Sequence, residues 1–228
     1  MAILKTAKYR STSTAPKKPK PVRMYTVGEE IANAVTHGIG ALLAIAGTVL
    51  LIVKAQGALQ VVSFSIYGTT MLMLYVSSTM YHSLTHMGAK RVFQVLDHSS
   101  IFLLIAGSYT PFMLVSVQGT LGWSIWGLNM AFAVAGIIIE AVARDRFHKV
   151  QLVIYVLMGW MCVLAMPQLL ESIPWDGVVL LIIGGLCYTG GIVFYVWKKL
   201  PYSHPIWHMF VLAGTVTHYL AVQLYVAG

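Results

Sequence analysis

The chain has 228 residues, of which 58% are hydrophobic and 10% are charged, with a formal net charge of +8 and a mean hydropathy of +0.76. Water-soluble domains carry about 25% charged residues, so this composition excludes a soluble globular protein. The apolar runs of about 20 residues match the hydrocarbon thickness of a bilayer. We therefore predict a multi-pass protein of the cell membrane.

The N-terminal segment, residues 1–26, differs from the rest of the chain. It has seven Lys and Arg residues, no Asp or Glu, and repeated Ser, Thr and Pro. Such a composition predicts a disordered arm attracted to anionic lipid head groups. Lipid attraction accounts for these charges, so we expect membrane lipids as partners and no nucleic acid.

Apolar runs separated by charged or Pro/Gly breaks predict an all-α, seven-transmembrane helix bundle for residues 27–228. The linkers are short, which leaves no room for a second domain. The predicted helices cover residues 31–53, 61–84, 94–116, 121–141, 150–169, 177–197 and 204–226.

The Lys and Arg residues of alternate loops predict the orientation, because positive residues are retained on the cytoplasmic side. Fourteen of the 15 basic residues fall on the side of the N-terminus, and Lys54 alone falls on the other. This places the N-terminus in the cytoplasm and, after seven spans, the C-terminus outside.

Histidines in two distant helices are predicted to lie at the same depth, near the cytoplasmic surface. The last predicted helix begins with His204 and His208, whose spacing of four puts both rings on one helical face. His82 ends the second predicted helix at that surface, one turn further in than His86. Polar side chains inside a membrane usually mark function, and three histidines with one open position suit catalytic zinc. Iron or copper also accepts imidazole ligands, but zinc suits a three-histidine site best.

Asp97 is the one acid predicted at the depth of these histidines, at the start of the third predicted helix. It has two possible roles, as a helix cap or as the general base for a metal-bound water. Ser78, one turn before His82, either bonds back to its own helix or donates to an oxyanion. The other acids are predicted in loops or at helix ends, with Glu29 and Glu30 preceding the first helix and Glu140 ending the fourth.

Four segments resemble the bacterial hemolysin III family. They are EEIANAVTHGIGALLAIAG, SSTMYHSLTH, VLDHSSIFLLIAGSYTPF and HPIWHMFVLAGTVTHYLAV. This family belongs with the progestin and adipoQ receptors, and more widely with the alkaline ceramidases, in a superfamily of seven-helix membrane proteins. The resemblance implies that His82, His204 and His208 bind zinc, that Asp97 contacts the water on the metal, and that Ser78 belongs to the hydrolytic set.

Three functions follow as hypotheses. The first is a zinc-dependent hydrolase of a lipid amide or ester, involved in membrane homeostasis. The second is a receptor-like sensor of membrane state in which zinc is structural. The third is a pore, as the family's name suggests. His218, about 15 Å from His208 along the helix, and His37 are predicted to be structural, and His37 also to line the vestibule of the site.

Overall fold

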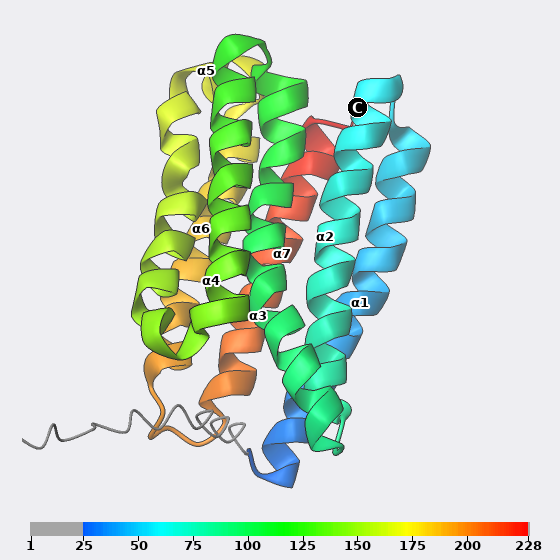
Figure 1. Cartoon of the computed structure of the whole chain (residues 1–228). Coiled ribbons are helices and arrows are strands. Elements are labelled where there is room, and N and C mark those ends of the chain that lie inside the picture. Colours follow the sequence, from blue (N-terminus) through cyan, green and yellow to red (C-terminus); the bar gives the residue numbers. More distant parts are fainter. Residues whose placement is uncertain (1–24, 228) are drawn as a thin grey trace, which may run out of the picture.

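The structure, a computed structural model, describes residues 25–227 apart from the side chains of residues 144–146 and 148. The predicted disordered arm thus lies outside the described residues, except for Tyr25 and Thr26. All regular structure in the described part is helical (Figure 1), so the all-α prediction is confirmed. The elements are α1 (Val27–Lys54), α2 (Ala58–Ser83), α3 (Met87–Thr110), a π-helical segment η1 (Pro111–Val117), α4 (Gly119–Trp160), a 3-10 segment η2 (Met161–Ala165), α5 (Met166–Ser172), α6 (Trp175–Val196) and α7 (Ser203–Tyr225).

Six helical stretches of the described chain are long and apolar enough to cross a membrane: residues 27–54, 58–83, 87–117, 119–143, 149–172 and 175–196. The fourth and fifth both begin within α4, whose backbone leaves the helical conformation at Ala143 and Phe147. The chain reverses direction there (Figure 1), as predicted for a loop between two helices. α7 also runs along the bundle, but it carries three histidines and is not among the six.

Two helices, α1 and α3, begin a full turn or more earlier than predicted. Thr26 and Glu29 form a capping box, in which the Thr26 hydroxyl accepts from Glu29 N and the Glu29 carboxylate accepts from Thr26 N, so α1 starts at Val27 and not at residue 31. His86 caps α3 by accepting from Ala89 N at 3.3 Å, which moves its start from residue 94 to Met87. Glu30 consequently lies within α1, and Asp97 lies well inside α3.

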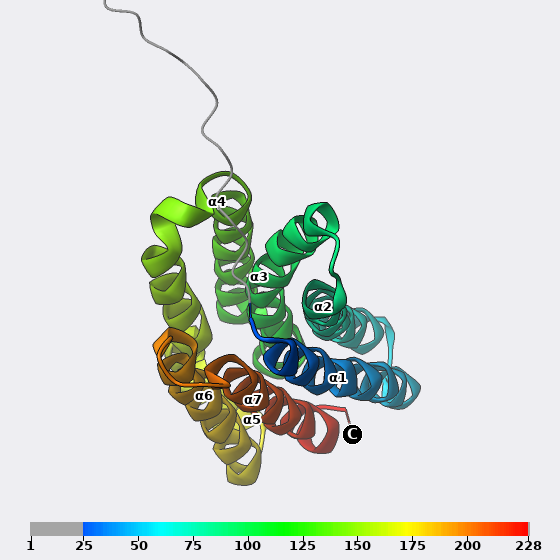
Figure 2. The same cartoon turned by 90° about the horizontal axis from the view of Figure 1, so that it is seen from below.

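The helices pack so that segments far apart in sequence become neighbours. α1 lies beside α2 and α7, and α6 lies on the other side of α7 (Figure 2). Close packing of α6 on α7 depends on small residues, as the glycines of the sixth predicted helix indicate. A Cβ atom on Gly191 would come within 2.8 Å of both Phe210 and Trp207. This packing places the start of α7 next to α1 and the end of α2.

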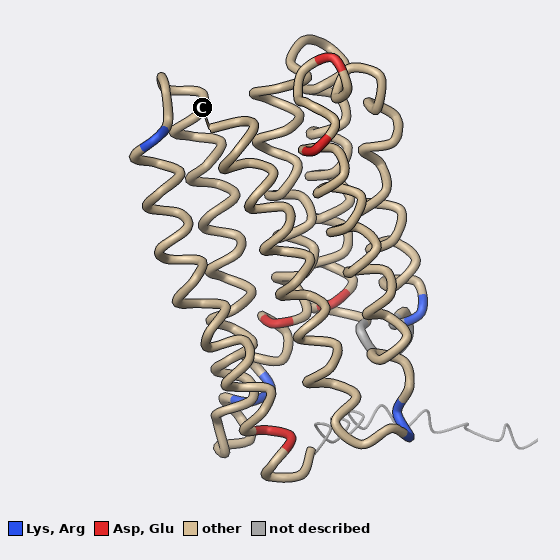
Figure 3. Tube along the Cα trace, turned by 180° about the vertical axis from the view of Figure 1, so that it is seen from behind, with Lys and Arg blue, Asp and Glu red and all other residues tan. Residues whose placement is uncertain are grey.

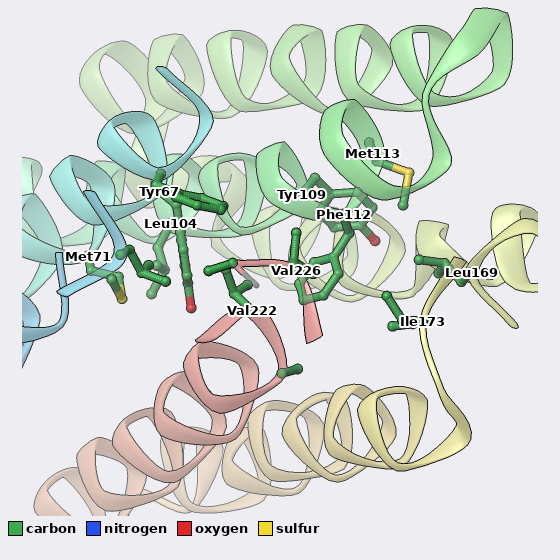
Figure 4. Close-up of a cluster of buried hydrophobic side chains, with 14 of the residues drawn as sticks. Tyr67, Met71, Leu104, Tyr109, Phe112, Met113, Leu169, Ile173, Val222 and Val226 are labelled. Atoms are coloured by element: carbon green, nitrogen blue, oxygen red, sulfur yellow. The ribbon is translucent and has the colours of Figure 1, made fainter. Parts of the chain in front are cut away.

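The two ends of the bundle differ in chemistry. Most of the described Lys and Arg positions lie at the end opposite the C-terminus (Figure 3). The half nearer the C-terminus is filled by buried apolar and aromatic side chains (Figure 4). This cluster includes Tyr67, Met71, Leu104, Tyr109, Phe112, Met113, Leu169, Ile173, Val222 and Val226. His82, in the last turn of α2, and His204 and His208, in the first turns of α7, lie towards the basic end.

Candidate metal centre

Three buried histidines converge where the end of α2 meets the start of α7. His82 occupies the last turn of α2, and His204 and His208 occupy the first turns of α7. One ring nitrogen from each lies within 4.8 Å of the other two. Zinc binds imidazole nitrogen at about 2.0–2.1 Å, so movements on the order of 1 Å or less would let the three rings share one ion.

The hydrogen bonds of the rings decide which nitrogens are available. His82 donates from Nδ1 to Glu30 Oε2 at 2.6 Å, and the Asn33 side-chain amide lies 3.3 Å from the same nitrogen. His208 donates from Nδ1 to the Asn33 carbonyl oxygen at 3.3 Å and to Thr36 Oγ1 at 3.2 Å. With Nδ1 protonated in both rings, Nε2 carries the lone pair that a metal requires.

Unsatisfied nitrogens test whether this site suits a metal. Within the part of the chain that the structure describes, His82 Nε2 and both ring nitrogens of His204 have no hydrogen-bond partner. A buried polar atom without a partner costs about 1–3 kcal/mol, and native proteins contain few. A cation bound between the rings would satisfy His82 Nε2 and one of the two His204 nitrogens. The three histidines therefore form a group that can bind a metal ion.

Asp97 lies beside this group, well inside α3. Its side chain is buried and lines the same cavity as His204 and His208. His86 is the residue that caps α3, and Asp97 lies almost three turns further along. The helix-capping role considered for Asp97 is therefore wrong.

Ser78 is fully buried and close to the Asp97 carboxyl. Its hydroxyl has no hydrogen bond of ordinary length and angle among the described residues. The neighbouring Ser77, by contrast, donates to the Leu74 carbonyl oxygen at 3.1 Å. Ser78 thus does not bond back to its own helix, and its hydroxyl is available to a ligand near Asp97.

The remaining histidines fall outside the group of three. His86 is the α3 cap, at the end of the bundle where it was predicted. His218 lies against the Leu181 carbonyl oxygen, with Nε2 at 3.1 Å, which agrees with its predicted structural role. His37 lines the cavity, as predicted, and its ring stacks on His208 with 3.5 Å between centroids. Tyr25 covers the opposite side of the group, stacking on His204 at 5.0 Å.

Two acids that the sequence placed in loops or at helix ends are partners of histidines, one buried and one half-buried. Glu30 contacts both His82 and Lys90, whose Nζ lies 2.7 Å from Glu30 Oε1. Glu140 lies 3.0 Å from Nδ1 of His98, which lines the cavity next to Asp97. The expectation that Asp97 alone shares the depth of the histidines is therefore wrong. The sequence did carry a signal for the role of Glu30. Its spacing from Asn33, Thr36 and His37 puts these four polar residues on one face of α1.

An elongated cavity leads from the histidines into the bundle. Asp97, His204 and His208 line one end, and His218 lines it about three turns further along α7. Between them the wall is mainly apolar and aromatic, with Leu104, Ile105, Tyr109, Trp160, Tyr188 and Val211. The distance along α7 from His208 to His218 is about 15 Å, roughly half the hydrocarbon thickness of a bilayer. An extended hydrocarbon chain of that length would match the cavity.

Comparison with known proteins identifies relatives along most of the chain. The model for Haemolysin-III related proteins matches residues 25–219. Hemolysin-3 of Bacillus cereus is 44% identical over 203 residues, which cover 88% of this chain and 93% of that protein. The Homo sapiens monocyte to macrophage differentiation factor is 30% identical over 210 residues, covering 88% and 85%. Heptahelical transmembrane protein ADIPOR2 of Oryza sativa subsp. japonica is 26% identical over 157 residues, covering 60% and 69%.

Proposed function

Because the chain belongs to the haemolysin III family of multi-pass cell-membrane proteins, we propose that it is a zinc-dependent hydrolase of a lipid amide or ester. One observation carries the proposal. Three buried histidines form a group that can bind a metal ion, and two of them, His204 and His208, line the end of an apolar cavity together with the buried carboxyl of Asp97. This combination would supply the ligands of a metal ion, a base and room for an acyl chain.

The ligands in this proposal are Nε2 of His82 and His208 and one ring nitrogen of His204. Zinc held by these three imidazoles would supply Lewis-acid chemistry, lowering the pKa of water and polarising a carbonyl oxygen. Zinc is also favoured over iron or copper because hydrolysis requires no redox chemistry.

Asp97 and Ser78 perform the proton transfer and the charge stabilisation. The Asp97 carboxylate takes a proton from the attacking water as its oxygen bonds to the carbonyl carbon, and then delivers this proton to the departing amine or alcohol. Ser78 donates its hydroxyl hydrogen to the carbonyl oxygen, on which negative charge develops. The bond between the carbonyl carbon and the leaving nitrogen or oxygen then breaks, which releases a fatty acid.

The cavity indicates the substrate class. Its apolar and aromatic wall favours an acyl chain lying between His208 and His218, while the polar end holds the amide or ester bond. Membrane lipids are the compounds that present such a chain next to such a bond within a bilayer.

We also propose that α7 forms a seventh span, with the N-terminus in the cytoplasm. Two facts support this topology: the charges gather at one end of the bundle (Figure 3), and a relative is named heptahelical. A reporter active only outside the cytoplasm, fused after residue 228, should be active. An inactive fusion, with the same reporter active in the loop at Lys54, would contradict the topology.

Metal and lipid measurements on detergent-purified protein test the hydrolase. We expect one zinc per chain, lost in His208→Ala, and release of fatty acid from at least one amide or ester in a broad lipid panel. Zinc-loaded protein that hydrolyses none of the panel would instead favour the sensor with structural zinc. Ion flux through liposomes containing the purified protein would favour the pore.

A further inference from the structure

Glu30 connects three helices at the metal centre, although the sequence places it at the edge of the membrane. One carboxylate oxygen accepts from His82 of α2 at 2.6 Å, and the other accepts from Lys90 of α3 at 2.7 Å. Glu30 itself belongs to α1. The His82 side chain is fully buried, that of Lys90 is 5% exposed and that of Glu30 is 17% exposed. Both charge-assisted bonds are therefore largely shielded from water.

The position of His82 explains why its ring requires such a partner. His82 is the last residue but one of α2, which ends at Ser83. Backbone bonding weakens in the last turn of a helix, so the backbone alone defines the ring poorly. The bond from Nδ1 to Glu30 fixes both the orientation of the ring and the tautomer that directs Nε2 towards His204 and His208. Carboxylates that orient metal-bound histidines in this way also raise the basicity of the ligand.

Lys90 extends the connection to the predicted base. Its Nζ donates to Glu30 and to two carbonyl oxygens at the end of α2. These are the carbonyl oxygens of Tyr81, at 3.0 Å, and of Leu84, at 3.4 Å. A cation is favoured at this end by the helix dipole. Asp97 lies seven residues after Lys90, two turns along the same face of α3. The bonds of Lys90 therefore fix the position of α3, with Asp97, against the helix that carries His82.

We propose that Glu30 is a positioning residue of the metal centre, which orients His82 and connects it through Lys90 to the helix that bears Asp97. This inference rests on the metal site of the proposed function. It does not depend on the identity of any substrate, and the metal alone is a sufficient probe.

Two other acids provide matched controls. Glu29 is adjacent in sequence, but it caps α1 and accepts from Tyr202 N at 3.1 Å, without contacting His82. Glu140, which is buried, forms the other pair between a histidine and a glutamate, with His98. Glu29→Gln tests loss of charge next to Glu30, and Glu140→Gln tests loss of a buried carboxylate elsewhere in the bundle.

The experiment measures zinc affinity of detergent-purified full-length variants by competition with a chromophoric chelator, together with the visible spectrum of the cobalt-loaded proteins. Glu30→Gln should weaken zinc binding by about 10- to 100-fold and alter the cobalt spectrum. Glu30→Asp, which keeps the charge on a shorter side chain, should fall between wild type and Glu30→Gln. Glu29→Gln and Glu140→Gln should stay within about twofold of wild type.

The inference is wrong if Glu30→Gln binds zinc within about twofold of wild type and gives the same cobalt spectrum. It is equally wrong if Glu140→Gln weakens binding as much as Glu30→Gln. If Glu30→Gln fails to fold, Glu30→Asp decides the matter by the same two measurements. Wild-type protein that binds neither metal would refute the metal site itself, an outcome distinct from a normal Glu30 variant.

Discussion

Two pairs of histidine and glutamate lie in the same half of the bundle, and their burial is opposite. In the His82–Glu30 pair, the histidine side chain is 0% exposed and the glutamate 17%. In the His98–Glu140 pair, the histidine is 18% exposed and the glutamate 1%. The first pair points an imidazole inwards to other imidazoles, whereas the second points a carboxylate inwards.

The surroundings of each pair fit this difference. Nε2 of His82 faces His204 and His208 and has no hydrogen-bond partner among the described residues. Glu140 instead accepts from Gln151 Nε2 at 2.8 Å as well as contacting His98, and Tyr155 donates to the His98 carbonyl oxygen at 3.1 Å. The same two residue types thus suit a metal site in one place and the packing of α3 against α4 in the other.

Removing a ligand should have the largest effect. His208→Ala deletes one of three imidazoles and leaves a gap beside His37, so we expect zinc binding to weaken by more than the roughly 100-fold that a supporting residue contributes. Metal analysis after dialysis against a chelator would measure the loss. His218→Ala is the control, because His218 lies about 15 Å away along α7, and it should keep its metal. Equal zinc content in His208→Ala and His218→Ala would mean that His208 is not a metal ligand. A metal site would then no longer distinguish the His82–Glu30 pair from the His98–Glu140 pair.

Removing the base should separate catalysis from metal binding. Asp97→Asn keeps the size of the side chain but cannot take a proton, and general-base catalysis contributes about 100- to 10,000-fold. We expect fatty-acid release to fall within that range while zinc content stays at the wild-type level. Unchanged hydrolysis would exclude Asp97 as the base, and loss of zinc would make it part of the ligand set.

Breaking the second pair should affect stability and leave the metal in place. Glu140→Ala removes one partner of a buried pair, which costs about 3–5 kcal/mol in proteins. We expect the lower end of that range, because the His98 side chain is 18% exposed. Denaturant unfolding of the metal-free protein measures the change, and zinc affinity of the folded fraction should match wild type. A stable variant that has lost zinc would reverse the roles assigned to the two pairs.

The sequence contained enough to predict which three histidines meet but not which side chains support them. The spacing of His204 and His208, and the charges of the loops, predict which side chains meet at one end of the bundle. The contact of Glu30 with His82 depends on α1 starting four residues earlier than its apolar run, which the capping box of Thr26 and Glu29 causes. The contact of His98 with Glu140 depends on how α3 packs against α4, and periodicity within one helix carries no information on that.

Tyr25 offers the smallest test, on the outer side of the metal centre. Its ring stacks on His204, with 5.0 Å between centroids and 24° between planes, and lies edge-on to His82 at 5.5 Å. Aromatic pairs contribute about 0.5–1.5 kcal/mol, so Tyr25→Ala should accelerate zinc loss to an excess of chelator by roughly twofold to tenfold. Tyr25→Phe keeps the ring and should release zinc at the wild-type rate. If both variants release zinc at the same rate as wild type, Tyr25 does not hold His204 in place, and the inner face formed by α1, with Glu30 and Asn33, accounts for the order of the site.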